Sequence, residues 1–210
     1  MNIKQFEKAV LAAATDLCGR EEELCKLDSF VGDGDHGMSL KKGFSNVVTM
    51  INSEEALNFH DFLFNVAMAF SEKAGGAIGP ILASLFLGMS DAVSVDKTEL
   101  SVTDMADLLK SGTERIQTLG GALPGESTLV DTLIPAYTSL GENSQDEMCV
   151  ALGKMVESAY AGAMSTKDMA AKKGRARYLD DKSIGYIDAG AMSMYYFLKA
   201  FTESIQSSAC

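Results

Sequence analysis

The chain has 210 residues, of which 47% are hydrophobic and 22% charged, so its composition is that of a globular protein and not of a disordered one. Aspartate and glutamate (29) outnumber lysine and arginine (18), and the net charge of −11 argues against a nucleic-acid-binding protein, which needs a basic surface. This length suits one domain with a substantial core, and we expect a single domain over residues 1–210.

The apolar stretches indicate neither a signal peptide nor a membrane span. The N-terminal apolar patch is short and is broken by Glu7 and Lys8. The longest uncharged stretch, residues 74–90, is interrupted by Pro80 and falls short of the roughly 18 to 20 apolar residues that a span requires. The four cysteines form no C-x-x-C pair, and Cys18 and Cys25, seven residues apart and so on one face of a helix, are expected to be buried thiols. We expect a cytoplasmic protein that does not contact membranes.

Apolar residues recur at helical spacing along most of the chain, and no segment alternates with period two long enough to predict a strand. The pattern predicts about eight helices, near residues 3–17, 40–51, 59–70, 81–89, 102–120, 129–137, 148–159 and 191–205. The predicted fold class is therefore all-α. Glycine-rich connections separate some of these helices, at residues 31–37, 74–79, 120–125 and 174–190.

The first glycine-rich connection is strongly acidic. In "LDSFVGDGDHG", Asp28, Asp33 and Asp35 fall within eight residues, among glycines and beside His36. Like charges this close repel one another unless a positive group holds them, and Mg²⁺ prefers such oxygen ligands. The alternative is a solvated loop in which an aspartate caps the next helix. His36 could donate a hydrogen bond, handle a proton or be purely structural.

The other glycine-rich connections also lie at predicted helix starts. "GGAIGP" precedes one apolar helix, and "GGALPGESTLVD" leads into another. Backbone N–H groups at a helix N-terminus form a natural anion site, although each loop could also be an ordinary cap. "KKGRARYLDDKSIGYIDAGA" carries half of the chain's four arginines. Of the four glycine-rich loops, one is acidic and one is basic, and together the four loops predict the rim of a single phosphate-binding pocket. The sequence contains no G-x-x-x-x-G-K-[ST], so this pocket is not a P-loop.

These motifs, in this order, resemble the nucleotide-binding L subunit of bacterial dihydroxyacetone kinase over almost the whole chain. The resemblance rests on "GDGDHG" with its upstream aspartate, "GGAIGP", "PGESTLVD" and "GRARYLDDKSIGYIDAGA". It implies a barrel of eight antiparallel helices that binds ADP or ATP with two Mg²⁺ at one end. It also implies two partners: a K-type subunit that holds the sugar and an M-type subunit whose phosphohistidine recharges ADP.

Carried over by position, the resemblance implies roles for individual residues. Asp28, Asp33 and Asp35 would be Mg²⁺ ligands, and the catalytic group would comprise these three with His36 and Arg175. The nucleotide-binding residues would be His36, Gly37, Met38, Ser39, Gly76, Ala77, Ile78, Gly79, Gly121, Thr128, Leu129, Arg175, Asp188, Ala189 and Gly190. The aspartate triad is intact, so the resemblance implies phosphoryl transfer to dihydroxyacetone or a related small ketose.

Several positions depart from the family's common pattern, among them the stretch "GESTL", where the family commonly has "GDKTM". Ser39 stands in place of Asn, Ile78 in place of Ser, and Tyr186 and Ala189 in place of the polar ring and the proline of "GHxDPG". These departures leave other readings open: a ketose kinase subunit that uses free ATP directly, a nucleotide sensor without catalysis, or a helical scaffold. The related fatty-acid kinase domain shares the acidic turn but typically has Thr at the position of His36.

Overall fold

The computed structural model describes residues 1–53 and 55–209, and Cys210 lies outside them. The α-helices of this part are α1 (Ile3–Gly19), α2 (Glu21–Ser29), α3 (His36–Ser53), α4 (Phe59–Lys73), α5 (Ile78–Asp91), α6 (Val102–Gly120), α7 (Val130–Glu142), α8 (Met148–Ser165) and α9 (Ala189–Ala209). Two 3₁₀ segments, η1 (Thr166–Asp168) and η2 (Ala176–Ser183), follow α8. The predicted all-α fold class is confirmed, and no described helix is long and apolar enough to span a membrane.

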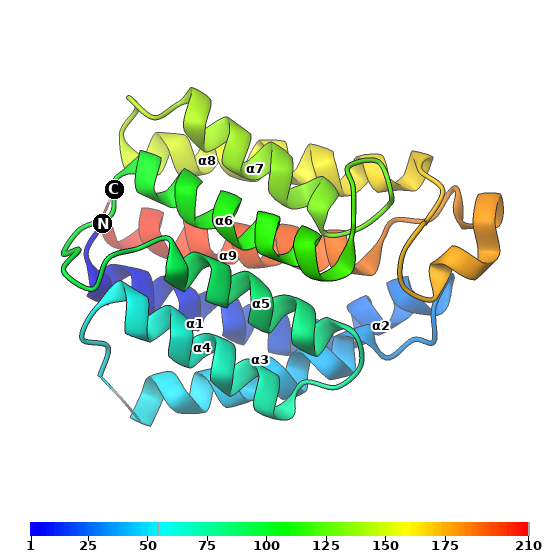
Figure 1. Ribbon diagram of the computed structural model, residues 1–210, viewed down its shortest axis with the longest axis horizontal. Helices are drawn as coiled ribbons and strands as arrows, with labels where there is room; N and C mark the ends of the chain where they lie inside the picture. Colours follow the sequence, from blue (N-terminus) through cyan, green and yellow to red (C-terminus); the bar gives the residue numbers. More distant parts are fainter. Residues whose placement is uncertain (54, 210) are drawn as a thin grey trace.

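All the α-helices except α2 form one closed ring. Helix α1 packs against α3, each helix from α3 to α8 packs against the next, and α9 returns to α1. Neighbouring helices of this ring run antiparallel (Figure 1). The barrel of antiparallel helices that the resemblance implies is therefore confirmed.

Aromatic side chains fill the interior of the barrel. Phe6 of α1 contacts Phe59 and Phe201 edge to face, with ring centroids 5.6 and 5.4 Å apart, and Phe44 stacks on Phe197 at 5.7 Å. All five side chains are buried. Large aromatic side chains dominate the energetics of such cores because each removes about 150–250 Å² from water. The interior between these rings is a packed hydrophobic core.

Two helix boundaries show how local sequence sets the elements. Helix α6 begins at a capping box, in which Ser101 and Asp104 accept each other's backbone N–H groups, and it ends at Gly121, whose φ is 62°. Helix α2 was not predicted, because it is only nine residues long and Leu24 is its one fully buried residue. One buried apolar residue in nine is too few to show the 3.6-residue spacing by which a helix is recognised in a sequence.

The antiparallel ring places the starts of alternate helices at one end. Helices α3, α5, α7 and α9 all begin at the end of the barrel opposite the chain termini, where α2 and η2 also lie (Figure 1). The connections that lead into these helices are the glycine-rich segments singled out in the sequence. The fold thus gathers at one end the segments that carry the candidate site.

Candidate functional site

The aspartates of the acidic turn converge. Asp28 lies near the C-terminus of α2, and Asp33 and Asp35 follow in the turn; one carboxylate oxygen of each lies within 4.8 Å of the others. The Asp35 backbone N–H donates to Asp28 Oδ2 at 3.1 Å. Glycine at position 32 allows the turn to pass this close to the Asp28 carboxylate, because a Cβ at Gly32 would lie 2.1 Å from Asp28 Oδ1.

This convergence is electrostatically unfavourable without a cation. Desolvation and the neighbouring charges of Asp33 and Asp28 raise the pKa of Asp35. Asp28 also lies at the negative end of the α2 dipole. Arg175 supplies one positive group, with its Nε 2.7 Å from Asp33 Oδ2, but its side chain is 71% exposed. Three carboxylates in this arrangement fit a hard divalent ion such as Mg²⁺, which prefers oxygen ligands.

Helix α2, which carries Asp28, is anchored to the barrel at its other end. The Tyr196 hydroxyl of α9 donates to Glu23 Oε1, and the Arg20 guanidinium lies 3.9 Å from the centre of the Tyr196 ring. Arg20 also pairs with Asp16 of α1, with 2.6 Å between Nε and Oδ2. These contacts fix the start of α2 against α1 and α9, and they thereby help to place Asp28.

His36 is the first residue of α3 and reaches across to α9. Its Nε2 lies 3.2 Å from Ser193 Oγ, and the Ser193 hydroxyl donates to Gly190 O at 2.8 Å. Desolvation lowers the pKa of His36 to about 4, although the charge of Asp28 opposes this shift. The imidazole is therefore neutral at physiological pH and joins the acidic turn to the first turn of α9.

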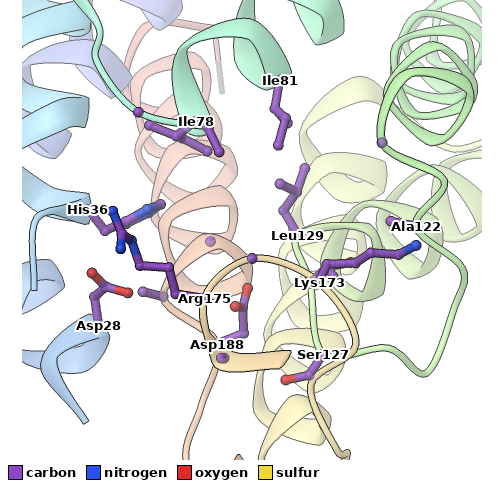
Figure 2. A pocket seen from close by; sticks show the side chains of 18 of the residues that line it. Asp28, His36, Ile78, Ile81, Ala122, Ser127, Leu129, Lys173, Arg175 and Asp188 are labelled. Atoms are coloured by element: carbon purple, nitrogen blue, oxygen red, sulfur yellow. The ribbon is translucent and has the colours of Figure 1, made fainter. Parts of the chain in front are cut away.

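A cavity of about 350 Å³ opens beside the acidic turn. Its walls come from the four glycine-rich segments and from the helices that follow them (Figure 2). The predicted residues that line it are Asp28, Asp33, Asp35, His36, Ser39, Gly76, Ala77, Ile78, Thr128, Leu129, Arg175, Asp188, Ala189 and Gly190. The fold thus brings most of the predicted site residues to one cavity.

Four predicted residues do not line this cavity: Gly37, Met38, Gly79 and Gly121. A Cβ on Gly37 would lie 2.1 Å from Glu21 O, so this glycine serves the contact between α3 and α2. Met38 is 42% exposed on the outer side of α3. Gly79 packs on Ala74 of the preceding loop, and Gly121 is the left-handed cap of α6.

The far side of the cavity carries residues that sequence reasoning missed. Ile81 and Ile116 line it together with Leu129, and Figure 2 shows the side chains of Ile81 and Leu129 facing each other. Lys173 points toward Ala122 in the same view. Spacing cannot distinguish such isoleucines from core residues, and Lys173 stood out only as one member of a basic cluster. The cavity therefore has an acidic side and an apolar side.

A buried carboxylate organises the loop before α7. Asp131 accepts the backbone N–H groups of Gly125 at 2.6 Å and of Thr128 at 2.8 Å. Ser127 between them has a φ of 58°. Asp131 was noted in the sequence but not assigned to the site. It shapes the wall that Thr128 and Leu129 contribute.

Asp188 forms the base of the cavity and caps α9. Its Oδ1 accepts the backbone N–H of Ala191 at 2.7 Å, and its own N–H donates to Thr166 Oγ1 at 3.0 Å. Desolvation raises the pKa of Asp188 to about 7 despite these helix N–H groups, and the charges of Asp131 and Asp28 add to the rise. The group therefore titrates near neutral pH.

The cavity combines two kinds of charge selectivity. The N-termini of α3, α5, α7 and α9 surround it, and the dipoles of these helices favour anions. The aspartate triad on one wall favours a divalent cation. A polyanion that carries its own metal ions and an apolar group satisfies all three parts of the cavity.

Comparison with known proteins agrees with this geometry. Residues 30–203 match the model of the DAK2 domain family. The chain is 31% identical over 192 residues to "PEP-dependent dihydroxyacetone kinase, ADP-binding subunit DhaL" of Escherichia coli (strain K12). This match covers 90% of this chain and 91% of that protein. It is 36% identical over 182 residues, 87% of each chain, to "PTS-dependent dihydroxyacetone kinase, ADP-binding subunit DhaL" of Lactococcus lactis subsp. lactis (strain IL1403).

A solved structure shares the fold. The dihydroxyacetone kinase of C. freundii, crystallised with AMP-PNP and Mg²⁺, superposes with a TM-score of 0.78 at 22% sequence identity. The match covers 97% of this chain but only 34% of that structure, so this chain corresponds to about a third of the longer kinase.

Fold and site together define a helical-barrel protein with a cavity that combines an aspartate triad, helix N-termini and an apolar side. The chain belongs to the DAK2 domain family, in the group of the L subunits of dihydroxyacetone kinase.

Proposed function

We propose that residues 1–210 form one L-type domain, the nucleotide-binding, phosphoryl-transferring subunit of a dihydroxyacetone kinase. The observation that carries the proposal is the convergence of Asp28, Asp33 and Asp35 beside a cavity surrounded by helix N-termini. The names of the relatives support it, because two are ADP-binding subunits and the structural neighbour contains AMP-PNP and Mg²⁺.

In this proposal the aspartate triad holds two Mg²⁺ ions, which would neutralise the charge of the β- and γ-phosphates. The first turn of α3, from His36 to Ser39, and the backbone of Gly76 to Ile78 would form the phosphate-side wall. Ile78 lacks the hydroxyl common in the family, so the backbone amides of this loop would serve instead. The apolar side at Leu129 would take the adenine ring, with Asp188 to Gly190 closing the pocket.

Arg175 would assist the transfer itself. Phosphoryl transfer needs mainly in-line positioning and charge stabilisation. Figure 2 shows the Arg175 side chain reaching from its loop toward the side of the cavity where Asp28 and His36 lie. Because the Arg175 side chain is 71% exposed and its ion pair with Asp33 is therefore weak, Arg175 could leave that partner and contact a transferring phosphoryl group.

The sugar would be held by a partner subunit. Phe30 precedes Val31 of the cavity wall in the chain, and Tyr186 lies two residues before Asp188; these two side chains are 50% and 42% exposed and stack with ring centroids 5.4 Å apart. Such an exposed aromatic pair suits docking of a K-type subunit that carries dihydroxyacetone or a related small ketose. ADP would stay bound as a coenzyme and be recharged by the phosphohistidine of an M-type subunit.

Titration calorimetry with Mg-ADP tests the site. We expect Asp33→Ala to abolish binding while circular dichroism shows an unchanged helical fold, and Asp96→Ala, a change in an exposed loop away from the cavity, to bind like the wild type. Wild-type affinity in the Asp33→Ala variant would refute the metal assignment.

A transfer assay separates the proposal from its alternatives. With a K-type subunit and ketose present, slow nucleotide exchange and dependence on the M-type subunit would indicate the recharged coenzyme. Turnover on free ATP alone would indicate a directly ATP-dependent kinase subunit. Nucleotide binding without transfer to any ketose would indicate a sensor.

A further inference from the structure

Helices α3 and α9 are joined inside the site by a chain of two polar contacts. His36 Nε2 lies 3.2 Å from Ser193 Oγ, and Ser193 Oγ lies 2.8 Å from Gly190 O. Ser193 is fully buried, so water does not compete for its hydroxyl. Neither the sequence motifs nor the family resemblance singles out Ser193.

Counting hydrogens assigns the direction of both contacts. The Ser193 hydroxyl carries one hydrogen, and Gly190 O can only accept. If the hydroxyl donates to Gly190 O, the contact with His36 is a hydrogen bond only when Nε2 carries a proton and donates it. The opposite arrangement, with the hydroxyl donating to Nε2, leaves one of the two short contacts without a hydrogen. The first arrangement satisfies both contacts.

We propose that Ser193 is a positioning residue that fixes Nε2 of His36 as the protonated ring nitrogen, the one that donates to the Ser193 hydroxyl; in the neutral imidazole, Nδ1 then carries no proton. Nδ1 is then the free ring nitrogen, and it can only accept a hydrogen bond. The charge of Asp28 acts on the ring, and an ionised carboxylate cannot donate a hydrogen bond to Nδ1.

This tautomer restricts what His36 can contact, a consequence that rests on the proposed function. A ring with a bare Nδ1 cannot donate to an ionised phosphate oxygen. Its partner in the cavity must itself carry a proton, such as a water molecule or the hydroxyl group of an acceptor substrate. Ser193 would thus set His36 apart from the phosphate-binding backbone around it.

Histidine-selective ¹⁵N NMR on the ligand-free protein tests the tautomer directly. The chain has only two histidines, and His60, which is partly buried and has Nδ1 3.0 Å from Asp61 Oδ1, is an internal reference. We expect the wild-type His36 ring to show a protonated Nε2 and an unprotonated Nδ1 at neutral pH. A protonated Nδ1 with a bare Nε2 would overturn the proposal, whatever the variants do.

Two variants on α9 show whether Ser193 is the cause. In Ser193→Ala we expect the His36 signals to move toward a mixture of both tautomers. Thr202→Val is the matched control, because Thr202 is buried on the same helix and its Oγ1 has no hydrogen-bond partner among the residues that the structure describes. We expect this control to leave the His36 signals unchanged. An unaltered tautomer in Ser193→Ala would refute the role of Ser193.

Adding Mg-ADP distinguishes failure of the inference from failure of the proposed function. We expect Nδ1 of His36 to stay unprotonated in the complex. A proton that appears on Nδ1 would refute the restriction on its partner. A protein that binds no Mg-ADP at all would refute the proposed function, whereas the tautomer would still stand or fall on the ligand-free spectrum.

Discussion

Substituting Gly37 by alanine should destabilise the protein and weaken its metal site together, although Gly37 does not line the cavity. A Cβ there would lie 2.1 Å from Glu21 O, 2.9 Å from Glu21 C and 3.0 Å from the Cys25 N. All three are backbone atoms of α2, so the whole helix must shift. Overpacking typically costs about 1–3 kcal/mol, and a clash with backbone puts this case at the upper end.

Helix propensity offsets part of that cost, because alanine is better than glycine within a helix by about 0.5–1 kcal/mol. The net loss is then about 2 kcal/mol, which lowers the Tm of a protein of this size by about 4–8 °C. Since α2 carries Asp28, its shift should also weaken Mn²⁺ binding, measured by electron paramagnetic resonance.

Gly141→Ala in α7 is the control for this prediction, because a Cβ at Gly141 meets nothing within 4 Å. It should keep the wild-type Mn²⁺ affinity, with an equal or slightly higher Tm. A Gly37→Ala protein with wild-type Tm and Mn²⁺ affinity would show that α2 is not held by this contact and would refute the reasoning.

Two further changes test the charges of the site. Arg175→Met should tighten the binding of Mn²⁺ in the absence of nucleotide by up to about fivefold, because the exposed ion pair between Arg175 and Asp33 is worth at most about 1 kcal/mol. The same substitution should slow phosphoryl transfer. Weaker Mn²⁺ binding in the variant would contradict this reasoning. Because the pKa of Asp188 rises from 3.8 to about 7 on folding, the folded state binds more protons over that range, and the free energy of unfolding should fall as pH rises through it. Asp188→Asn, which keeps an oxygen to cap α9, should therefore gain Tm relative to the wild type between pH 5 and pH 8 in thermal scans; a constant difference would refute this.

Much of the fold could be predicted because its helices carry strong periodic patterns and clear end signals. The helix predicted at residues 102–120 matches α6 (Val102–Gly120), whose end is fixed by Gly121. Pro135 lies inside α7, a position where a proline usually breaks a helix. Proline has no backbone N–H, so Pro135 cannot donate the helix hydrogen bond to Asp131 O. Gly162 of α8 packs against this carbonyl oxygen, because a Cβ at Gly162 would lie 2.2 Å from it. Only the tertiary contact explains this proline.

The candidate site was predictable where residues of unusual chemistry are close in the sequence. Three aspartates within eight residues indicated a cation site, and the structure brings their oxygens together. Ser193 and Ile116 gave no such signal, because each lies on a helix and enters the site only through packing of α9 or α6. Gly37 gave a misleading signal, since a glycine beside an acidic turn suggests contact with a ligand as readily as contact between helices.

The central claim is that carboxylate-bound Mg²⁺ holds a nucleotide in this cavity, and the nucleotide content of the purified protein tests it most directly. The protein would be purified in parallel with and without EDTA and denatured, and the supernatant analysed by ion-exchange chromatography. The proposed function predicts near-stoichiometric ADP without EDTA and its loss with EDTA. ADP that remains fully bound after EDTA treatment would contradict a site built on the aspartate triad.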